Sequence, residues 1–295
     1  MKQRSPAPES WSTLRLKVNK RAGTYATEDA ALKDVVGLLP AGGAATRISP
    51  LPCSKELYPI GFGRVHGTTE RRPKVVCHYL FEKMRRANIT KAYVILKQGK
   101  WDIPAYLGDG KTLDMDLAYL MMDLPYGPPY TLNQAYPFIK DNLVAFGFPD
   151  ILFRPDDVFT KLLVDQQQSS ADAVLGLFPA DQPTKMDMVD VDQNGQVRRI
   201  VANPSRTNLS HSWAAAIWSP IFTQFLNEFV RSHEKLAASM PESSVGDVIQ
   251  AAVNDNLNVR AIKVSSEPYL DIGTPEGILT ATKRFALEES DSSVF

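Results

Sequence analysis

The sequence has little cysteine, little histidine and no excess of charge of either sign. Only two of its 295 residues are cysteines, Cys53 and Cys77, which excludes a disulfide framework and favours a reducing compartment. The four histidines lie far apart without ligand spacing, which disfavours a zinc site. Basic and acidic residues number 33 each, so no bulk field attracts nucleic acid or an anionic membrane. We expect a cytoplasmic protein with no nucleic-acid partner.

Long apolar runs are also absent. No segment approaches the ~20 apolar residues of a membrane span, and residues 1–34 lack the apolar core of a secretory signal. The composition, 44% hydrophobic and 22% charged, is that of a globular protein with a sizeable core. We therefore expect a soluble protein without membrane contact, in which an N-terminal extension (1–34) precedes one folded domain (35–289).

Short apolar runs alternate with helical patterns through the first half of that domain. This alternation predicts an α/β fold with a doubly wound, mostly parallel sheet that is covered by helices on both faces. A helix with Pro73 in its first turn is expected from the apolar spacing of residues 75–84. The other helices are predicted over residues 132–139 and 157–168, and the strands over 35–39, 93–96, 117–122, 143–146 and 173–178.

The pattern changes after Pro179. Residues 186–192 and 196–201 flank Asn194-Gly195, which predicts a hairpin with a primed two-residue turn, and hence an antiparallel insertion. Trp213 and Trp218 lie in a further predicted strand, where a five-residue separation should place them on opposite faces as packing residues. The remaining predictions are helices over 220–238 and from a Thr274 N-cap to about residue 289, and strands over 259–264 and 269–272.

A loop of small residues follows the first predicted strand. Its successive backbone N–H groups could cradle phosphates, and the candidate nucleotide ligands are Ala41, Gly42, Gly43, Ala44, Ala45 and Thr46. Arg47 could add a bidentate partner and Lys55 a point charge. The glycine spacing does not fit the dinucleotide fingerprint, and no Gly-Lys-Ser/Thr ends the loop as in a P-loop. The residues thus predict a polyphosphate site, with a plain tight turn as the alternative.

Two aspartates stand near the ends of predicted strands that are far apart in sequence. They are Asp150, in Gly147-Phe148-Pro149-Asp150, and Asp271, in Leu270-Asp271-Ile272-Gly273-Thr274. Strand ends of an open α/β sheet line one crevice, so both carboxylates could converge on Mg²⁺, which favours one or two carboxylates together with substrate phosphates. The simpler reading of either aspartate is a helix cap or a turn residue.

These motifs resemble the signature of the nucleotide-sugar pyrophosphorylases, the sugar-1-phosphate nucleotidylyltransferases. Ala41-Gly42-Gly43, Thr46-Arg47 and the run Ser54-Lys55-Glu56-Leu57-Tyr58-Pro59-Ile60 match it, most closely in the style of the glucose-1-phosphate thymidylyltransferases, and the resemblance covers about residues 35–287. It implies a nucleotide-diphospho-sugar transferase fold and a reaction in which an NTP and a sugar 1-phosphate give an NDP-sugar and pyrophosphate. It also implies Mg²⁺ on Asp150 and Asp271, with Arg47 on the leaving pyrophosphate and Lys55 on the transferred phosphates.

Two further matches are less distinctive. Thr131-Leu132-Asn133-Gln134-Ala135 resembles a family helix start near the base and sugar, which implies that Gln134 binds nucleotide. Asp247 matches a family position at another helix start, where a helix cap is the simpler interpretation.

The departures from the family pattern bear on the substrate. Ala45 replaces a signature glycine, which is tolerable only if its φ is negative, and the connection from Pro50 to Lys55 is two residues shorter than usual. Ala202-Asn203-Pro204 replaces the family's Glu-Lys-Pro, whose lysine and glutamate bind the acceptor. Asn203 and Arg206 therefore become the candidate acceptor ligands, with Arg199 as a substitute.

Three functions stay open at this point. The resemblance favours transfer to a sugar 1-phosphate, and the altered motif allows transfer to a non-sugar phosphate or phosphonate, or a catalytically silent nucleotide-binding homologue. Its expected partners are an NTP and a phosphorylated small molecule. The nucleobase, the acceptor and the oligomeric state, a homo-oligomer included, are not determined by the sequence.

Overall fold

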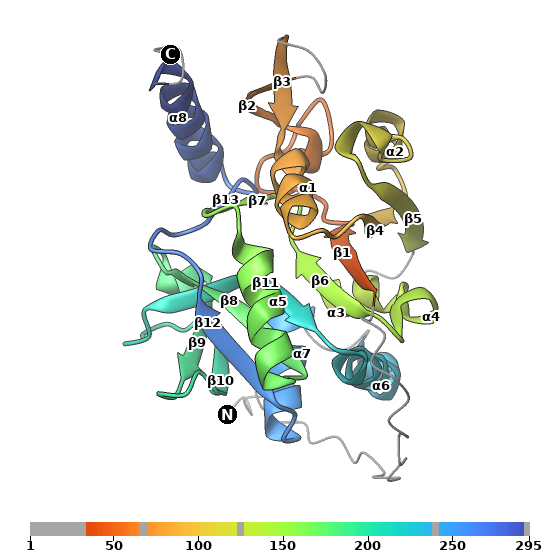
Figure 1. The fold of residues 1–295 in the computed structure, drawn as a ribbon, viewed down its shortest axis with the longest axis vertical. Helices are drawn as coiled ribbons and strands as arrows, with labels where there is room; N and C mark the ends of the chain where they lie inside the picture. Colours follow the sequence, from red (N-terminus) through yellow and green to blue (C-terminus); the bar gives the residue numbers. More distant parts are fainter. Residues whose placement is uncertain (1–33, 65–69, 123–126, 238–241, 292–295) are drawn as a thin grey trace, which may run out of the picture.

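The computed structural model describes residues 34–64, 70–122, 127–237 and 242–291 (Figure 1). The predicted N-terminal extension lies outside the described residues except for Asp34. Within the described ranges, no helix combines the length and apolar character needed to cross a membrane.

The elements follow the predicted alternation of strands and helices. The strands are β1 (Val35–Ala41), β2 (Pro59–Arg64), β3 (Arg71–Val75), β4 (Lys91–Lys97), β5 (Asp116–Met122), β6 (Leu143–Gly147), β7 (Ile151–Leu152), β8 (Ala173–Pro179), β9 (Asp187–Val191), β10 (Val197–Ala202), β11 (His211–Trp218), β12 (Val259–Lys263) and β13 (Leu270–Asp271). The α-helices are α1 (Val76–Arg86), α2 (Asp102–Leu107), α3 (Pro128–Asn133), α4 (Tyr136–Ile139), α5 (Val158–Ser169), α6 (Pro220–Ala237), α7 (Val245–Asn254) and α8 (Pro275–Asp291), with 3₁₀ turns η2 (Lys55–Leu57), η3 (Lys111–Leu113) and η4 (Pro183–Lys185).

A nine-stranded mixed sheet runs through the molecule in the order β10-β9-β11-β6-β1-β4-β5, and β8 joins β12 to β11. Strands β6, β1, β4 and β5 are parallel, as are β8 and β12. Strand β11 is antiparallel to both β6 and β8 and so links the two parallel parts. The expected doubly wound, mostly parallel sheet is confirmed, as is the antiparallel β9–β10 insertion.

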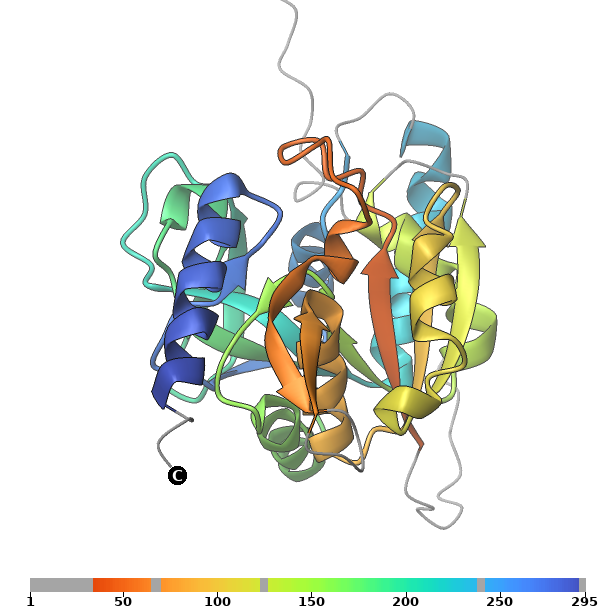
Figure 2. The same cartoon turned by 90° about the horizontal axis from the view of Figure 1, so that it is seen from above.

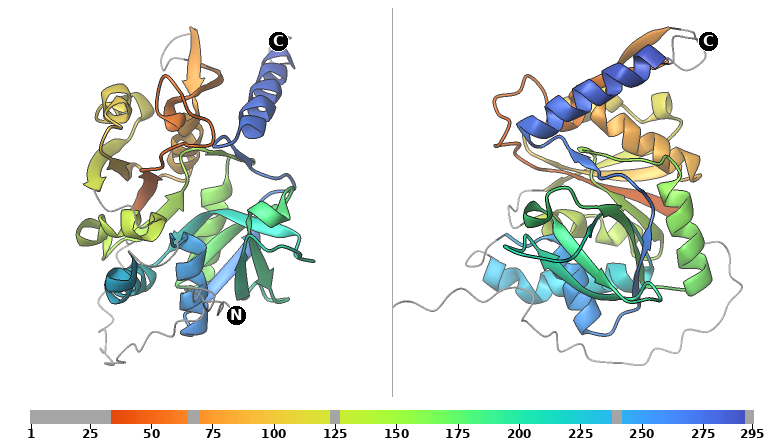
Figure 3. Two further views of the ribbon diagram at one scale, coloured as in Figure 1. Left: turned by 180° about the vertical axis from the view of Figure 1, so that it is seen from behind. Right: turned by 90° about the vertical axis from the view of Figure 1, so that its left-hand side faces the viewer.

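Helices cover both faces of the sheet because its strands are apolar on both sides (Figure 3). Successive residues of β1 show this, since Leu38 packs with the core that α3, α6 and α7 cover, and Leu39 with the core that α1 and α5 cover. Both side chains are essentially fully buried. The two cores therefore hold the sheet rigidly from either side and fix the position of its strand ends.

A third, smaller core lies outside the main sheet. Helix α8 runs alongside the β2–β3 hairpin (Figure 2) and encloses Ile60, Val76, Leu152, Ile272 and Phe285 with it. The predicted cap of α8 is present, because Thr274 Oγ1 accepts the Gly277 N–H at 3.1 Å.

The start of α1 differs from the prediction. Pro73 lies in strand β3, opposite Phe62, and the helix begins only at Val76. A proline is tolerated there because β3 is an edge strand, so the missing N–H of Pro73 can face the side where no further strand would accept it.

Two further local predictions are wrong in detail. The helix expected over 132–139 is broken into α3 and α4, because Pro137 has no N–H with which to continue the helical ladder. Gly195 has a φ of 80°, whereas Asn194 does not have a positive φ, so the turn is not of the primed type. Instead, Asp192 closes a longer loop by accepting the Asn194 and Gln196 N–H groups at 2.8 and 2.9 Å.

The two tryptophans of β11 lie on one face of the sheet. A bulge between Trp213 and Ala215 shifts the register against β8 by one residue, which reverses the alternation beyond it. Both indoles pack against Phe146, with ring centroids at 5.9 Å for Trp213 and 5.2 Å for Trp218. Their predicted role in packing is confirmed, and their predicted placement on opposite faces is wrong.

Candidate active site

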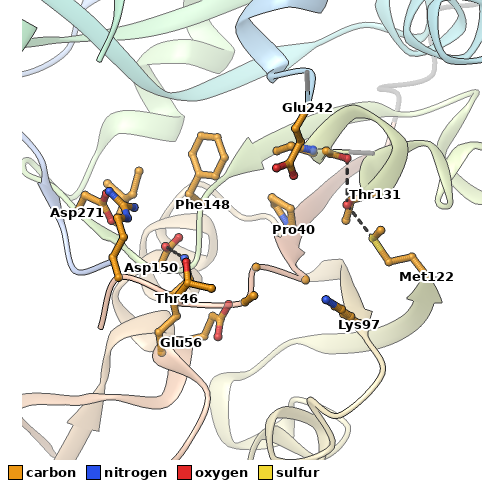
Figure 4. Close-up of a pocket in the computed structure, with 18 residues that line it drawn as sticks. Pro40, Thr46, Glu56, Lys97, Met122, Thr131, Phe148, Asp150, Glu242 and Asp271 are labelled. Atoms are coloured by element: carbon orange, nitrogen blue, oxygen red, sulfur yellow. Dashed lines mark hydrogen bonds and ion pairs between the residues drawn. The ribbon is translucent and has the colours of Figure 1, made fainter. Parts of the chain in front are cut away.

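A cavity of about 610 Å³ opens at the carboxyl ends of the four neighbouring parallel strands (Figure 4). Phe148 follows β6, Gly42 follows β1, and Lys97 and Met122 end β4 and β5. Such a crevice is where open α/β sheets bind their ligands. Its wall is formed by Pro40, Gly42, Gly43, Ala44, Thr46, Arg47, Lys55, Glu56, Lys97, Met122, Gly127, Pro128, Thr131, Phe148, Asp150, Ile151, Glu242 and Asp271.

The small-residue loop forms one side of this cavity. A side chain at Gly43 would meet the Lys55 ammonium, because a Cβ built there lies 3.4 Å from Lys55 Nζ. Lys55 thus reaches the loop despite the shortened connection before it. Ala45 has a φ of 53°, contrary to the negative value expected, and its carbonyl accepts the Ile48 N–H and the Ser49 hydroxyl, both at 3.1 Å. These two bonds offset the cost of about 1–2 kcal/mol of a left-handed alanine.

Asp150 and Asp271 come together through two very short strands. Strands β7 and β13 pair antiparallel with Asp271 opposite Ile151, and the Ile272 N–H donates to the Asp150 carbonyl at 3.2 Å. Both carboxylates line the cavity. The convergence that the sequence predicted is therefore present.

Each of the two carboxylates faces a cation. Lys55 Nζ lies 2.5 Å from Asp150 Oδ2, and Arg47 Nη2 lies 3.3 Å from Asp271 Oδ2. Burial by itself would lower the pKa of Lys55, but the ion pair with Asp150, helped by Glu56 and Asp271, raises that pKa above its usual value. Lys55 is therefore a fully charged ammonium at the floor of the cavity.

The donor set also suits a hard divalent cation. Within the described ranges, no group of three or more histidine, cysteine, aspartate and glutamate residues gathers as a closed metal site. Mg²⁺ needs only one or two carboxylates when phosphate oxygens and waters complete its shell, so Asp150 and Asp271 fit it.

Several cavity residues were not expected from the sequence. Glu56 and Lys97 line the cavity beside predicted residues, and Phe148 and Glu242 complete the opposite side together with Thr131, which belongs to the segment that the resemblance implied near the base and sugar. The Thr131 hydroxyl donates to Met122 Sδ at 2.8 Å and to the Gly127 carbonyl at 3.3 Å. The signal for Glu56 was its place directly after Lys55, whereas Lys97, Phe148 and Glu242 reach the cavity through strand order and helix packing, which no local motif encodes.

Other predicted residues are not on the cavity wall. Ala41 is buried as the last residue of β1, and the Gln134 amide donates to the Tyr130 carbonyl at 3.3 Å at the end of α3. Asn203 and Arg206 are exposed beyond the end of β10. Asp247 is the partner in a capping box with Ser244, as its simpler interpretation predicted.

The fold and the cavity together define a class of protein. The structure superposes on a putative glucose-1-phosphate thymidylyltransferase of Bacillus anthracis crystallised with sucrose, with a TM-score of 0.70, 17% identity and coverage of 85% of this chain and 95% of that one. It also superposes on a UTP-bound UGPase of Acinetobacter baumannii, with a TM-score of 0.68, 18% identity and coverage of 86% and 93%. The fold is thus that of the nucleotide-diphospho-sugar transferases.

The sequence comparisons show the family. The family model described as "Nucleotidyl transferase" matches residues 36–288, and the chain belongs to this family. It is 26% identical over 257 residues to the low-salt glycan biosynthesis nucleotidyltransferase Agl11 of Haloferax volcanii, over 84% of this chain and 65% of that protein. It is 21% identical over 260 residues to a glucose-1-phosphate thymidylyltransferase of Streptomyces antibioticus, over 87% and 67%. The chain thus spans about two thirds of the length of these relatives.

Proposed function

We propose that the protein condenses an NTP with a sugar 1-phosphate to an NDP-sugar and pyrophosphate, with Mg²⁺ as cofactor. The observation that carries the proposal is the meeting of a small-residue loop, two cations and two carboxylates in one cavity at the strand ends. The names of the thymidylyltransferase and glycan biosynthesis relatives support the substrate class. The UTP in the Acinetobacter structure supports a nucleoside triphosphate as donor.

Catalysis of this reaction depends mainly on positioning the two substrates and on neutralising the charge of their phosphates. An acceptor phosphate oxygen attacks the α-phosphorus in line, and the bond from that phosphorus to the bridging oxygen of pyrophosphate breaks. Arg47 binds the leaving pyrophosphate as a bidentate partner, and the Lys55 ammonium binds the transferred phosphate. Mg²⁺ bound by Asp150 and Asp271 would supply further positive charge to the phosphate oxygens. The backbone N–H groups of Gly42, Gly43 and Ala44 hold the donor's phosphates.

The acceptor contacts are a separate part of the proposal. Asn203, at the family's lysine position, can donate only neutral hydrogen bonds, so Arg206 is our candidate for the cation that binds the acceptor phosphate. Because both side chains are exposed and off the cavity wall, closure of the β9–β10 hairpin would be needed to bring them in. A non-sugar phosphate or phosphonate acceptor is the second candidate, favoured by the Ala202-Asn203 replacement.

The cellular compartment is also part of the proposal. Cys53 and Cys77 are both free thiols, which suits the reducing cytoplasm. A homo-oligomer stays a prediction.

Pyrophosphate release over a panel of NTPs and phosphorylated acceptors tests the function. We expect release with at least one sugar 1-phosphate, loss of that release in EDTA, and a fall of at least ~100-fold in Asp271→Asn, which keeps the size of the side chain and removes its charge. Release only with a non-sugar acceptor would select the second candidate. Absence of release with every pair would favour the silent homologue, and full activity of Asp271→Asn or in EDTA would contradict the metal assignment.

A further inference from the structure

A buried ion pair lies directly beside the phosphate-binding lysine. Lys100 Nζ contacts both carboxylate oxygens of Glu56, at 2.7 and 2.8 Å. The Glu56 side chain is 2% exposed and that of Lys100 is 12% exposed, so water screens neither charge. Glu56 nevertheless belongs to the cavity wall, next to Lys55 in sequence.

Lys100 lies in the connection between β4 and α2, and the first residue of α2, Asp102, holds the residue on the other side of Lys55. Asp102 accepts the Ser54 backbone N–H at 2.6 Å and the Ser54 hydroxyl at 2.8 Å. Lys55 is therefore flanked by two residues that one short segment, residues 100–102, fixes in place. This arrangement aims the Lys55 side chain at the cavity.

An uncompensated carboxylate at Glu56 would oppose phosphate binding in two ways. It would repel the polyphosphate, and it would compete with phosphate for the Lys55 ammonium, which already pairs with Asp150 at 2.5 Å. In the observed arrangement, both Glu56 oxygens are taken by Lys100.

We infer that Lys100 is a positioning residue of the proposed reaction: by occupying Glu56, it leaves Lys55 available for the phosphates of the nucleotide. The inference rests on the proposed function, because it assumes that the cavity binds a polyphosphate. It adds a residue of the β4–α2 connection, outside the family signature, to the machinery for phosphate binding. Lys100 does not itself line the cavity.

Calorimetric titration with inorganic tripolyphosphate tests this role without an acceptor or a known base. In Lys100→Met we expect the dissociation constant to rise at least tenfold, because the freed Glu56 carboxylate repels the anion and captures Lys55. Adding Glu56→Gln to Lys100→Met should restore binding to within about threefold of wild type, and Glu56→Gln alone should bind as tightly as wild type or more tightly. If the Lys100–Glu56 pair had only a structural role, tripolyphosphate affinity would instead fall in every variant that breaks the pair.

A matched control is the ion pair between Lys83, on α1, and Asp156, which are 2.6 Å apart and do not line the cavity. Lys83→Met should lower the melting temperature but leave tripolyphosphate binding unchanged. Unchanged binding in Lys100→Met, or a double variant that binds at least tenfold more weakly than wild type, would overturn the inference. If Lys100→Met does not fold, Glu56→Gln and the double variant still decide the question, since both must bind within threefold of wild type or more tightly.

The binding experiment distinguishes failure of this inference from failure of the proposed function. If wild type does not bind tripolyphosphate at all, the polyphosphate site itself is contradicted, and the role of Lys100 with it. If wild type binds and Lys100→Met binds equally well, only the role of Lys100 is contradicted.

Discussion

Arg47 and Lys55 each face a carboxylate across the cavity, but the two cations are held differently. The Lys55 side chain is 14% exposed and pairs with Asp150 at 2.5 Å, whereas that of Arg47 is 62% exposed and pairs with Asp271 at 3.3 Å. An exposed ion pair contributes at most about 1 kcal/mol, so little opposes the transfer of Arg47 from Asp271 to a phosphate. This freedom suits a residue that binds and then releases pyrophosphate.

Substitution of Arg47 should therefore act on turnover and not on stability. We expect Arg47→Ala to lower kcat at least ~100-fold at saturating NTP, and Arg47→Lys to recover only part of the loss because a point charge lacks the bidentate fork. Steady-state pyrophosphate release, with melting temperatures as the folding control, measures this. Equal kcat for the three proteins would remove Arg47 from the mechanism.

Ala45 gives a test of the loop's backbone. Its φ of 53° predicts that Ala45→Gly is neutral or stabilises the protein by up to about 1 kcal/mol, since glycine relieves the left-handed strain but loses more chain entropy. The neighbouring Ala44 has no positive φ, so Ala44→Gly should destabilise by about 0.5–1 kcal/mol. Urea unfolding of both variants compares them directly. A larger loss for Ala45→Gly than for Ala44→Gly would contradict the observed loop conformation.

Among the secondary-structure elements, the β9–β10 hairpin and α7 bury a titratable carboxyl group where they contact each other. The Asp187 carboxylate packs so closely against Gly246 that its Oδ2 leaves no room for a Cβ at that position. Burial, reinforced by the charge of Asp247, raises the pKa of Asp187 to about 6. The folded state thus holds this proton more strongly than the unfolded chain does. Stability is lost as pH rises from about 4 through the folded pKa of about 6.

The substitution Asp187→Asn should remove this loss of folding stability at higher pH. We expect equal stability of variant and wild type near pH 4, and a gain for the variant that grows through pH 6 to about 2 kcal/mol at pH 7.5. Urea unfolding at a series of pH values measures the difference. Asp190→Asn on the same strand, where Asp190 pairs with Arg199 at 3.0 Å, should show no such gain. A pH-independent difference for Asp187→Asn would contradict the assignment.

The elements also show where sequence patterns stop being informative. The apolar runs predicted β1, β4, β6 and β8 because each is buried on both faces, and they also predicted the edge strand β5, which is only partly buried. The β2–β3 hairpin was missed because its proline and glycine residues indicate loop. The bulge at Trp213 was missed because a bulge depends on the partner strand and leaves no periodicity of its own.

At the scale of the whole molecule, the site depends on contacts that no local pattern encodes. The sequence predicted that Asp150 and Asp271 converge, on the reasoning that strand ends share one crevice. The contact that joins them is the pairing of β7 with β13, two strands of two residues each that lie outside the main sheet. A strand over residues 269–272 was predicted, but β7 was not, and strands of this length have no periodicity that would indicate their pairing. The loop and its cations were predictable because they are contiguous, whereas Lys97, Phe148 and Glu242 meet only through strand order and helix packing.

In the proposed reaction, the α-phosphorus of an NTP is transferred to a phosphorylated acceptor in this cavity. The most direct measurement uses two samples of the same NTP, one labelled with ³²P at the α-position and one at the γ-position, with the acceptor that supports pyrophosphate release. We expect the α-label to appear in the NDP-sugar and the γ-label in pyrophosphate. Label from the γ-position in the acceptor product, or an α-label that never leaves the nucleoside mono-, di- and triphosphate pool, would contradict it.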